Sequence, residues 1–276
     1  MHMNMSIMTY CYSRALASGA LDLAGMLQEY ARLGVPGVEL VQGHAAGMPT
    51  AELRARVDDL GLTVPLLLVG APVIDADPAK RAAAVEGMRP ALDMALGLGA
   101  KQIMLLPSGD AGNASDAEVR RFICDGIARA CEMVKGSGVQ IIVENHGGAH
   151  RLRGRVEHML EFAAAHPDLG LCFDDGNFLL AGEEELAALE KLADRVVHFH
   201  CKDWALSNEE GKGILAADGK RYVGAVIGEG VVPRTAVKKL QASGYSGFFS
   251  VEHEGPEDPV IATARAAANL RAILAA

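Results

Sequence analysis

The feature of this sequence that most constrains its fold is a regular alternation between short apolar runs and longer amphipathic segments. Apolar runs of this length are typical of buried strands, and strands that alternate with helices form parallel sheets. Eight such units close into a barrel, so we predict an α/β fold with a single (β/α)8 TIM barrel over residues 1–276. An open doubly wound sheet is the alternative, although no glycine-rich phosphate loop follows the first strand. The predicted strands are residues 5–12, 37–42, 62–69, 101–106, 139–144, 169–174, 196–200 and 247–252.

Two features interrupt this regular pattern. Pro90 falls inside a predicted helix, where it predicts a kink or a break because proline lacks the N–H group that a helix needs. The polar segment 202–229 is long for a connection between a strand and a helix. It contains Asp218-Gly219 between short apolar runs, which predicts a hairpin. We expect this segment to be a lid or a specificity loop.

Polar side chains gather where four of the predicted strands end. Side chains alternate between the two faces of a strand, so His198 and His200 of the run V-V-H-F-H share one face. Polar groups at the carboxyl ends of parallel strands are the arrangement of an active site on a barrel. The four strand ends carry Glu144, Asp174, His200 and Glu252.

These four side chains form an oxygen-rich ligand set of three carboxylates and one imidazole. Such a set suits hard divalent cations and leaves positions open for two substrate oxygens. We therefore predict a divalent metal ion, with Mn²⁺ as the first choice and Mg²⁺, Co²⁺ or Zn²⁺ as alternatives. Any one of these residues taken singly would more often be solvated or paired, and it is their equivalent position on four strands that favours a site.

Five short motifs carry a resemblance to a known family. The chain is similar, from residue 5 to its C-terminus, to the sugar phosphate isomerase/epimerase family of xylose isomerase-like TIM barrels. The resemblance implies a metal held by Glu144, Asp174, His200 and Glu252, with Asp174 preferred to Asp175 by the pattern D-x-G-N. The motifs are V-E-N-H-G-G, F-D-D-G-N-F, H-F-H-C-K-D, G-E-G-V-V and S-V-E-H-E-G.

The sequence departs from the ketose 3-epimerases within that family. Asn177 stands where those epimerases carry histidine, and no basic residue follows Lys202 at the place where they have one. The resemblance is therefore specific for the superfamily and not for the substrate.

The predicted activity is that of a metal-dependent isomerase or epimerase acting on a sugar or keto-sugar, phosphorylated or not. A metal that chelates a carbonyl and its neighbouring hydroxyl stabilises the enediolate formed as an α-proton leaves. Glu144 and Glu252 are the predicted catalytic pair, one on each face of that enediolate. The alternative is a lyase, which uses the same site to expel a β-leaving group from a keto-inositol or a 3-keto-glycoside.

Other polar residues near the strand ends have open interpretations. His146 could bond a substrate hydroxyl or lie in solvent at the rim, and Lys202 could polarise a carbonyl or pair with Asp203. Trp204 could stack on a sugar or anchor the long segment. We expect His198 to be packed one layer deeper, and His253 and Glu254 to be solvated. The predicted substrate-binding residues are His146, Asn177, Lys202 and Trp204.

Composition limits the partners. The formal net charge of −9 argues against nucleic acid, and no apolar run reaches the roughly 18 residues that span a membrane. Five scattered cysteines and the absence of a visible signal peptide predict free thiols and a cytoplasmic location. An endonuclease-IV-like DNA repair enzyme would need further histidines, which segment 202–229 lacks. A non-catalytic sugar-binding barrel and a homo-oligomer both remain open.

Overall fold

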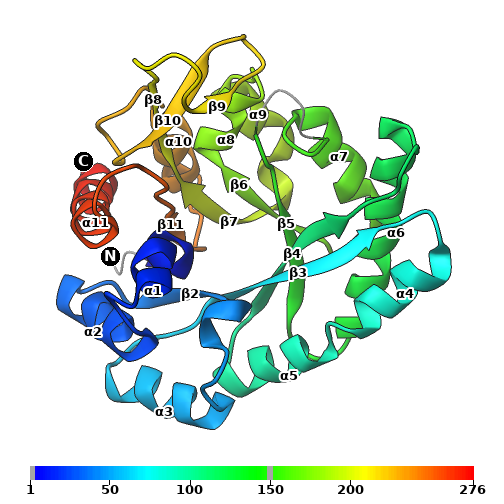
Figure 1. The fold of residues 1–276 in the computed structure, drawn as a ribbon, viewed down its shortest axis with the longest axis horizontal. Helices are drawn as coiled ribbons and strands as arrows, with labels where there is room; N and C mark the ends of the chain where they lie inside the picture. Colours follow the sequence, from blue (N-terminus) through cyan, green and yellow to red (C-terminus); the bar gives the residue numbers. More distant parts are fainter. Residues whose placement is uncertain (1–3, 148–151) are drawn as a thin grey trace.

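The apolar runs form a closed barrel of eight parallel strands (Figure 1), as predicted. The computed structural model describes residues 4–147 and 152–276. Around the barrel the strands follow the order β1-β11-β7-β6-β5-β4-β3-β2. Their bounds are β1 Met5–Met8, β2 Gly37–Val41, β3 Leu66–Ile74, β4 Gln102–Gly109, β5 Gln140–Glu144, β6 Gly170–Asp174, β7 Val196–Cys201 and β11 Phe249–Val251.

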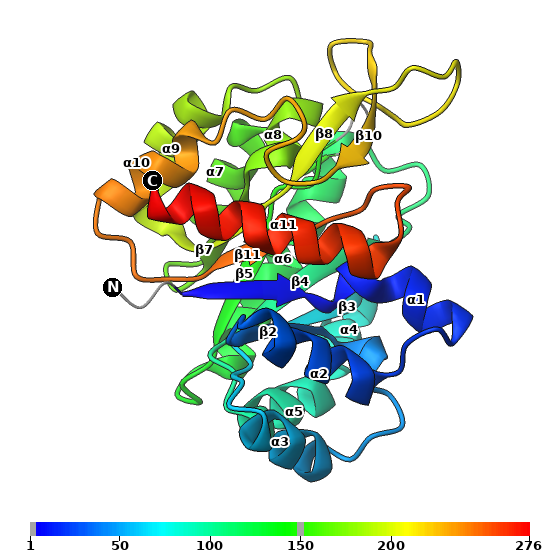
Figure 2. The ribbon, with the colours of Figure 1, turned by 90° about the vertical axis from the view of Figure 1, so that its left-hand side faces the viewer.

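Helices cover the outside of the barrel, and Figure 2 shows the last of them, α11, lying across the strands beside β1. None of the helices in the described part of the chain is long and apolar enough to cross a membrane. Their bounds are α1 Ser13–Ser18, α2 Leu23–Leu33, α3 Thr50–Asp59, α4 Pro78–Glu86, α5 Arg89–Leu98, α6 Asp116–Val134, α7 Val156–Ala165, α8 Asp175–Leu180, α9 Glu185–Leu192, α10 Thr235–Ala242 and α11 Pro259–Ala275.

The core has two layers, because every barrel strand has an inner and an outer face. Outward side chains such as Phe199 and Val251 belong to the large apolar cluster between the strands and the helices. A smaller cluster fills the barrel interior with Leu66, Met104, Ile142 and Cys172. His198 and His200 alternate with Phe199 and therefore face inward. His198 lies beside Cys172 of this interior cluster, and His200 lies one layer closer to the mouth.

Two predicted strands differ most from their bounds in the structure. The first ends at Met8, and Thr9–Tyr12 form a short 3-10 helix instead of continuing the strand. The third begins at Leu66, just after Pro65, which has no N–H group to donate to a neighbouring strand. It then runs on to Ile74 beside an equally extended β4. The end of β1 and the start of β3 are thus set by local packing and by proline, and not by the apolar pattern alone.

The break predicted at Pro90 is present. Helix α4 ends at Glu86 and α5 begins at Arg89, which places Pro90 in the first turn of a new helix. A missing N–H group is harmless there, because the first turn of a helix has no carbonyl partner for it. Helix α8, which starts directly at the end of β6, was not predicted.

Segment 202–229 folds into a three-stranded antiparallel sheet that stands above the barrel mouth (Figure 1). Its strands are β8 (Asp203–Leu206), β9 (Ile214–Leu215) and β10 (Arg221–Ala225), in the order β8-β10-β9. The hairpin predicted at Asp218-Gly219 joins β9 to β10 and is confirmed. We call this sheet the overhang. Its own small core consists of Leu180, Trp204, Ala216, Tyr222 and Val232.

Candidate active site and metal centre

The carboxyl ends of β5, β6, β7 and β11 bring the four predicted ligands together. One ligand atom from each residue lies within 4.8 Å of the others. All four side chains are buried, and Asp174 and His200 are completely so. Asp174 pairs with His200 across neighbouring strands, and Ser250, two residues before Glu252, pairs with His200 on the other side. The fold therefore builds the predicted cluster of Glu144, Asp174, His200 and Glu252.

The imidazole of His200 is held between carboxylates on both sides. Its Nδ1 atom lies 2.5 Å from Oε1 of Glu144 and 2.9 Å from Oε2 of Glu252. Its Nε2 atom lies 2.9 Å from Oε2 of Glu39. Nδ1 is therefore the nitrogen that faces the cluster, and Nε2 can donate to Glu39. A metal-binding histidine almost always donates its other N–H group in this way.

Glu39 also contacts His200, and sequence analysis did not assign it a role. It lies inside β2, completely buried, and its other oxygen accepts from the hydroxyl of Ser6 and lies 2.7 Å from Nε2 of His198. Burial opposes ionisation, but His198 and His200 hold the pKa of Glu39 well below its ordinary value. His198 is thus packed one layer deeper, as expected. The signal in the sequence was a single carboxylate within an apolar strand, V-E-L.

Replacing Glu39 with Gln should weaken metal binding about 10- to 100-fold, because partners of this kind orient a ligand and raise its basicity. The measurement is the dissociation constant for Mn²⁺ or Zn²⁺ by competition with a chelator, with the visible spectrum of the Co²⁺ form as a second readout. The melting temperature of the metal-free variant controls for folding. Wild-type affinity in a folded Glu39→Gln protein would contradict the role given to Glu39.

The two glutamates differ in what their outer oxygens contact. Oε2 of Glu144 lies 2.9 Å from Nε2 of His146, whereas Oε1 of Glu252 lies 2.8 Å from the ammonium of Lys202. Lys202 also lies 3.5 Å from Asp174 and 3.2 Å from Glu254. Burial lowers the pKa of Lys202, but these carboxylates outweigh it and raise that pKa well above its ordinary value. Lys202 is therefore a buried cation at the edge of the cluster.

Asp174 is positioned by its neighbours on α8 and β5. Its Oδ1 and Oδ2 atoms accept from the backbone N–H and the side-chain amide of Asn177, at 2.7 and 2.9 Å. Asn145 bonds the backbone of Asp174 through both of its amide atoms. Burial, followed by repulsion from Glu252 and Glu144, raises the pKa of Asp174 well above its ordinary value despite Lys202. Three buried carboxylates in contact need positive charge, so these residues fit a divalent cation.

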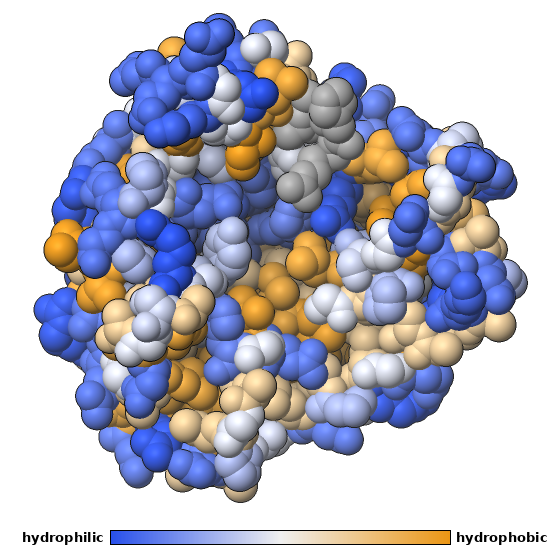
Figure 3. Space-filling model, viewed as in Figure 1, coloured by the Kyte–Doolittle hydropathy of each residue, from blue (hydrophilic) through white to orange (hydrophobic). Residues whose placement is uncertain are grey.

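Glu144 and Glu252 of the cluster line a cavity of about 390 Å³ at the barrel mouth. The face shown in Figure 3 is hollowed near its centre, where hydrophilic and hydrophobic residues lie side by side. A volume of this size accommodates a sugar or cyclitol ring. Residues on its lining include Leu68, Leu106, Glu144, His146, Asn177, Lys202, Ile214, Glu252 and Glu254.

The structure decides between the alternatives for Trp204 and Lys202, and it places His253 differently from the expectation. Lys202 lies on the lining of the mouth cavity, as expected for a substrate-binding residue. Trp204 is 1% exposed and packs in the core of the overhang, so it anchors the segment; it does not line the mouth cavity but borders a neighbouring one. Lys202 does not pair with Asp203, whose carboxylate lies 2.8 Å from Arg234 and accepts backbone N–H groups. His253 is buried and not solvated, because Ala225 and Gly255 supply partners for both ring nitrogens.

A sequence model of the xylose isomerase-like TIM barrel family matches residues 27–273. The chain belongs to this family. The resemblance carried by the five motifs is therefore confirmed.

The proteins to which this chain is similar in sequence or in structure include dehydratases and an epimerase. The chain is 30% identical over 148 residues to an inosose dehydratase of Geobacillus thermodenitrificans, over 51% of this chain and 48% of that one. It is 29% identical over 157 residues to the inosose dehydratase of Lacticaseibacillus casei, over 54% of this chain and 51% of that one. The matched stretch thus spans about half the length of these curated relatives.

Two solved structures show the same fold at low sequence identity. The structure of the IolI protein with a bound zinc atom has a TM-score of 0.79 at 15% identity, covering 99% of this chain and 98% of that one. The D-psicose 3-epimerase of Clostridium cellulolyticum H10, solved with D-tagatose, has a TM-score of 0.75 at 15% identity, covering 99% of both chains.

Proposed function

We propose that this protein is a metal-dependent lyase that eliminates a β-leaving group from a cyclic keto-polyol, either a keto-cyclitol or a keto-sugar. The inosose dehydratases to which the chain is similar over about half its length support this class of reaction. The isomerase or epimerase predicted from the motifs shares the first step, removal of the α-proton, but returns a proton to the substrate in the second step instead of expelling a group.

The observation that carries the proposal is the unequal surroundings of the two glutamates. An epimerase needs a proton carrier on each face of the substrate, so both carboxylates should be able to exchange protons. Here the outer oxygen of Glu252 lies 2.8 Å from the buried Lys202 ammonium, whereas that of Glu144 faces His146. An elimination requires one group that takes a proton and another that gives one, and Glu144 and the Lys202 ammonium supply these two roles.

In the proposed reaction, the outer oxygen of Glu144 takes the proton from the carbon next to the substrate carbonyl. The electron pair of the broken C–H bond forms a new carbon–carbon double bond as the β C–O bond breaks. Lys202 gives its proton to the departing oxygen, so the products are an α,β-unsaturated ketone and water or an alcohol. His146 lies 2.9 Å from Glu144 and can pass the abstracted proton to solvent.

A divalent cation held by Glu144, Asp174, His200 and Glu252 would polarise the substrate carbonyl and make the adjacent C–H bond more acidic. Asn177 keeps Asp174 oriented toward that position through two hydrogen bonds. Mn²⁺ is the metal predicted from the ligand types, and the zinc atom in the IolI structure makes Zn²⁺ the first competitor.

The deciding experiment combines metal analysis with product analysis. Purified protein should hold one divalent ion per chain by elemental analysis, and His200→Ala or Asp174→Ala should lose most of it, since the remaining carboxylates then repel one another. The metal-loaded protein should convert 2-keto-myo-inositol or a 3-keto-glucoside to an enone, detected by ultraviolet absorbance and mass. Formation of an epimer without elimination would favour the isomerase or epimerase instead.

A further inference from the structure

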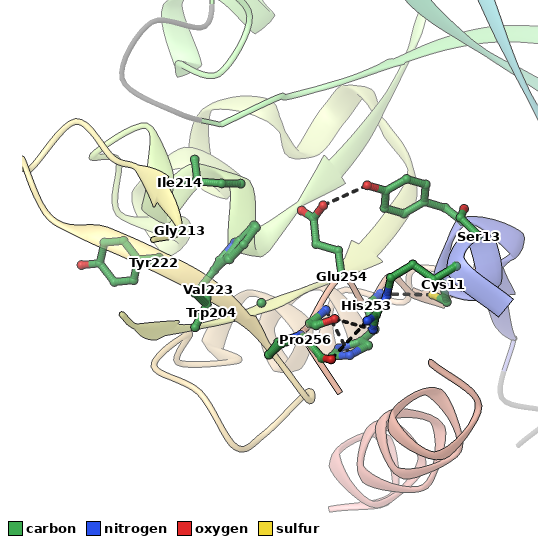
Figure 4. Close-up of a pocket in the computed structure, with 14 residues that line it drawn as sticks. Cys11, Ser13, Trp204, Gly213, Ile214, Tyr222, Val223, His253, Glu254 and Pro256 are labelled. Carbon is green, nitrogen blue, oxygen red and sulfur yellow. Dashed lines mark hydrogen bonds between the residues drawn. The ribbon is translucent and has the colours of Figure 1, made fainter. Parts of the chain in front are cut away.

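A second cavity, of about 450 Å³, opens beside the barrel mouth and shares part of its wall. Figure 4 shows this cavity, with Ile214 and Tyr222 of the overhang on one side and Cys11 and Ser13 on the other. Tyr10, Ile214 and Glu254 line both cavities. The two spaces are therefore separated by side chains and not by a strand or a helix.

The separating wall is a chain of polar contacts that begins at the active site. The ammonium of Lys202 lies 3.2 Å from Oε1 of Glu254, and the hydroxyl of Tyr10 donates to Oε2 of Glu254 at 3.1 Å. The side chain of Glu254 is 25% exposed and Tyr10 is 41% exposed. Partly exposed side chains can change rotamer without unfolding the barrel. A substrate group bonded to the oxygen atom that lies beside Lys202 can thus extend past Glu254 into the second cavity.

The charged groups on the described lining of this cavity already have partners. The guanidinium of Arg14 donates to the carbonyl oxygens of Pro256 at 3.1 Å and Gly255 at 2.7 Å. Both ring nitrogens of His253 have backbone partners, at Ala225 and Gly255. Backbone carbonyls thus take three of the five N–H groups of Arg14, and the carboxylate of Glu254 adds negative charge to the lining, so the cavity favours a neutral group over an anion.

The other side chains that line the second cavity are mostly apolar or aromatic. Tyr10 and Ile214 are large apolar residues that stay 41% and 37% exposed, and each lines both cavities. Exposed apolar surface that lines a concavity marks a binding site for apolar groups. The lining includes Tyr10, Trp204, Ile214, Tyr222, Val223 and Pro256.

We infer that the second cavity holds the leaving group of the substrate, and that this group is an alcohol or phenol with a planar apolar body. The inference rests on the proposed function and selects among its substrates. A free keto-inositol would fill only the mouth cavity, whereas a 3-keto-glycoside places its sugar ring there and its aglycone beyond Glu254. When the glycosidic C–O bond breaks, Lys202 protonates the departing oxygen and the apolar alcohol remains in the second cavity until release.

The experiment compares benzyl and methyl 3-keto-β-D-glucosides, whose alkoxides have nearly the same basicity, so that a difference reports binding and not leaving-group chemistry. The value of kcat/KM is measured for the metal-loaded wild type, for Val223→Trp, which fills the cavity, and for Val231→Trp as a control. Val231 lies outside both linings and is 49% exposed. Calorimetric binding of benzyl and methyl β-D-glucosides provides a readout without turnover.

We expect the benzyl compound to be favoured at least about tenfold, because a phenyl ring leaves water on binding. Val223→Trp should remove that preference, while Val231→Trp should change the kcat/KM of neither compound. Equal kcat/KM and equal affinity for the two compounds, or no binding of either, would overturn the inference. Turnover of 2-keto-myo-inositol alone would overturn it and leave the proposed function standing. A benzyl preference in binding without elimination would support the cavity and refute the lyase.

Discussion

Replacing Glu144 with Gln should lower the rate of elimination by about 10²–10⁴ and should also stop exchange of the substrate α-proton with solvent. Glutamine keeps the shape of the side chain and one oxygen that can face a metal, but it has no carboxylate to accept a proton. The outer oxygen that is lost lies 2.9 Å from His146, and both residues line the mouth cavity. Both effects are measured in D₂O, with product followed by absorbance and deuterium in the substrate by NMR.

Two controls separate the loss of a base from other effects of this variant. Elemental analysis at saturating metal excludes a protein that has lost its cation, since Glu144 also lies in the ligand cluster. Glu157→Gln is the matched control, because Glu157 lies in the first turn of helix α7 with a side chain 69% exposed and does not line the cavity. If metal-loaded Glu144→Gln turned over at the wild-type rate, the base would lie elsewhere, with His146 as the next candidate.

Replacing Lys202 with Met should reduce the rate of elimination by about 10²–10⁴. Unlike Glu144→Gln, this variant should continue to exchange the α-proton of the substrate for deuterium. Methionine preserves the length of the side chain but cannot protonate a departing oxygen. The carbanion formed by Glu144 would then return to substrate by picking up a proton instead of expelling its leaving group. The measurement is the ratio of exchange to elimination, which should rise sharply in Lys202→Met and stay near the wild-type value in Lys191→Met on α9.

The ratio of α-proton exchange to elimination in Lys202→Met shows whether Lys202 acts as a proton donor or only as a cation that balances the nearby carboxylates. Removing Lys202 also leaves Glu252, Asp174 and Glu254 without a cation that lies 2.8 to 3.5 Å away. If that electrostatic loss were the whole effect, exchange and elimination would fall together. A proportional fall of both rates with metal retained would therefore contradict the role of Lys202 as the proton donor.

The barrel and the clustering of the four candidate ligands could be predicted because each depends on a local pattern. Eight apolar runs separated by helical segments leave few topologies, and parallel strands place their carboxyl ends at one rim. Glu144, Asp174, His200 and Glu252 each lie within one residue of the carboxyl end of a strand, so their convergence follows from the fold without any knowledge of the loops. Strand bounds were less accurate at the first and third strands, where proline and side-chain packing decide the ends.

Contacts between distant parts of the chain could not be predicted. Glu39 bonds His200 from 161 residues away, across the barrel interior, and no periodicity in the sequence marks that pair. The same is true of Lys202, which could pair with its neighbour Asp203 but is instead held by Glu252 and Glu254. Charge pairing depends on distances in space, which are set only when the strands close.

The sequence by itself therefore determined the fold class and the position of the four-residue cluster, since both follow from residue type and strand period. Only the tertiary structure decided which carboxylate lies beside Lys202, which nitrogen of His200 faces Glu144 and Glu252, and where the second cavity opens. The second cavity arises where the overhang meets the residues after β1 and β11. Those segments have no repeating pattern, and their positions result from packing against one another.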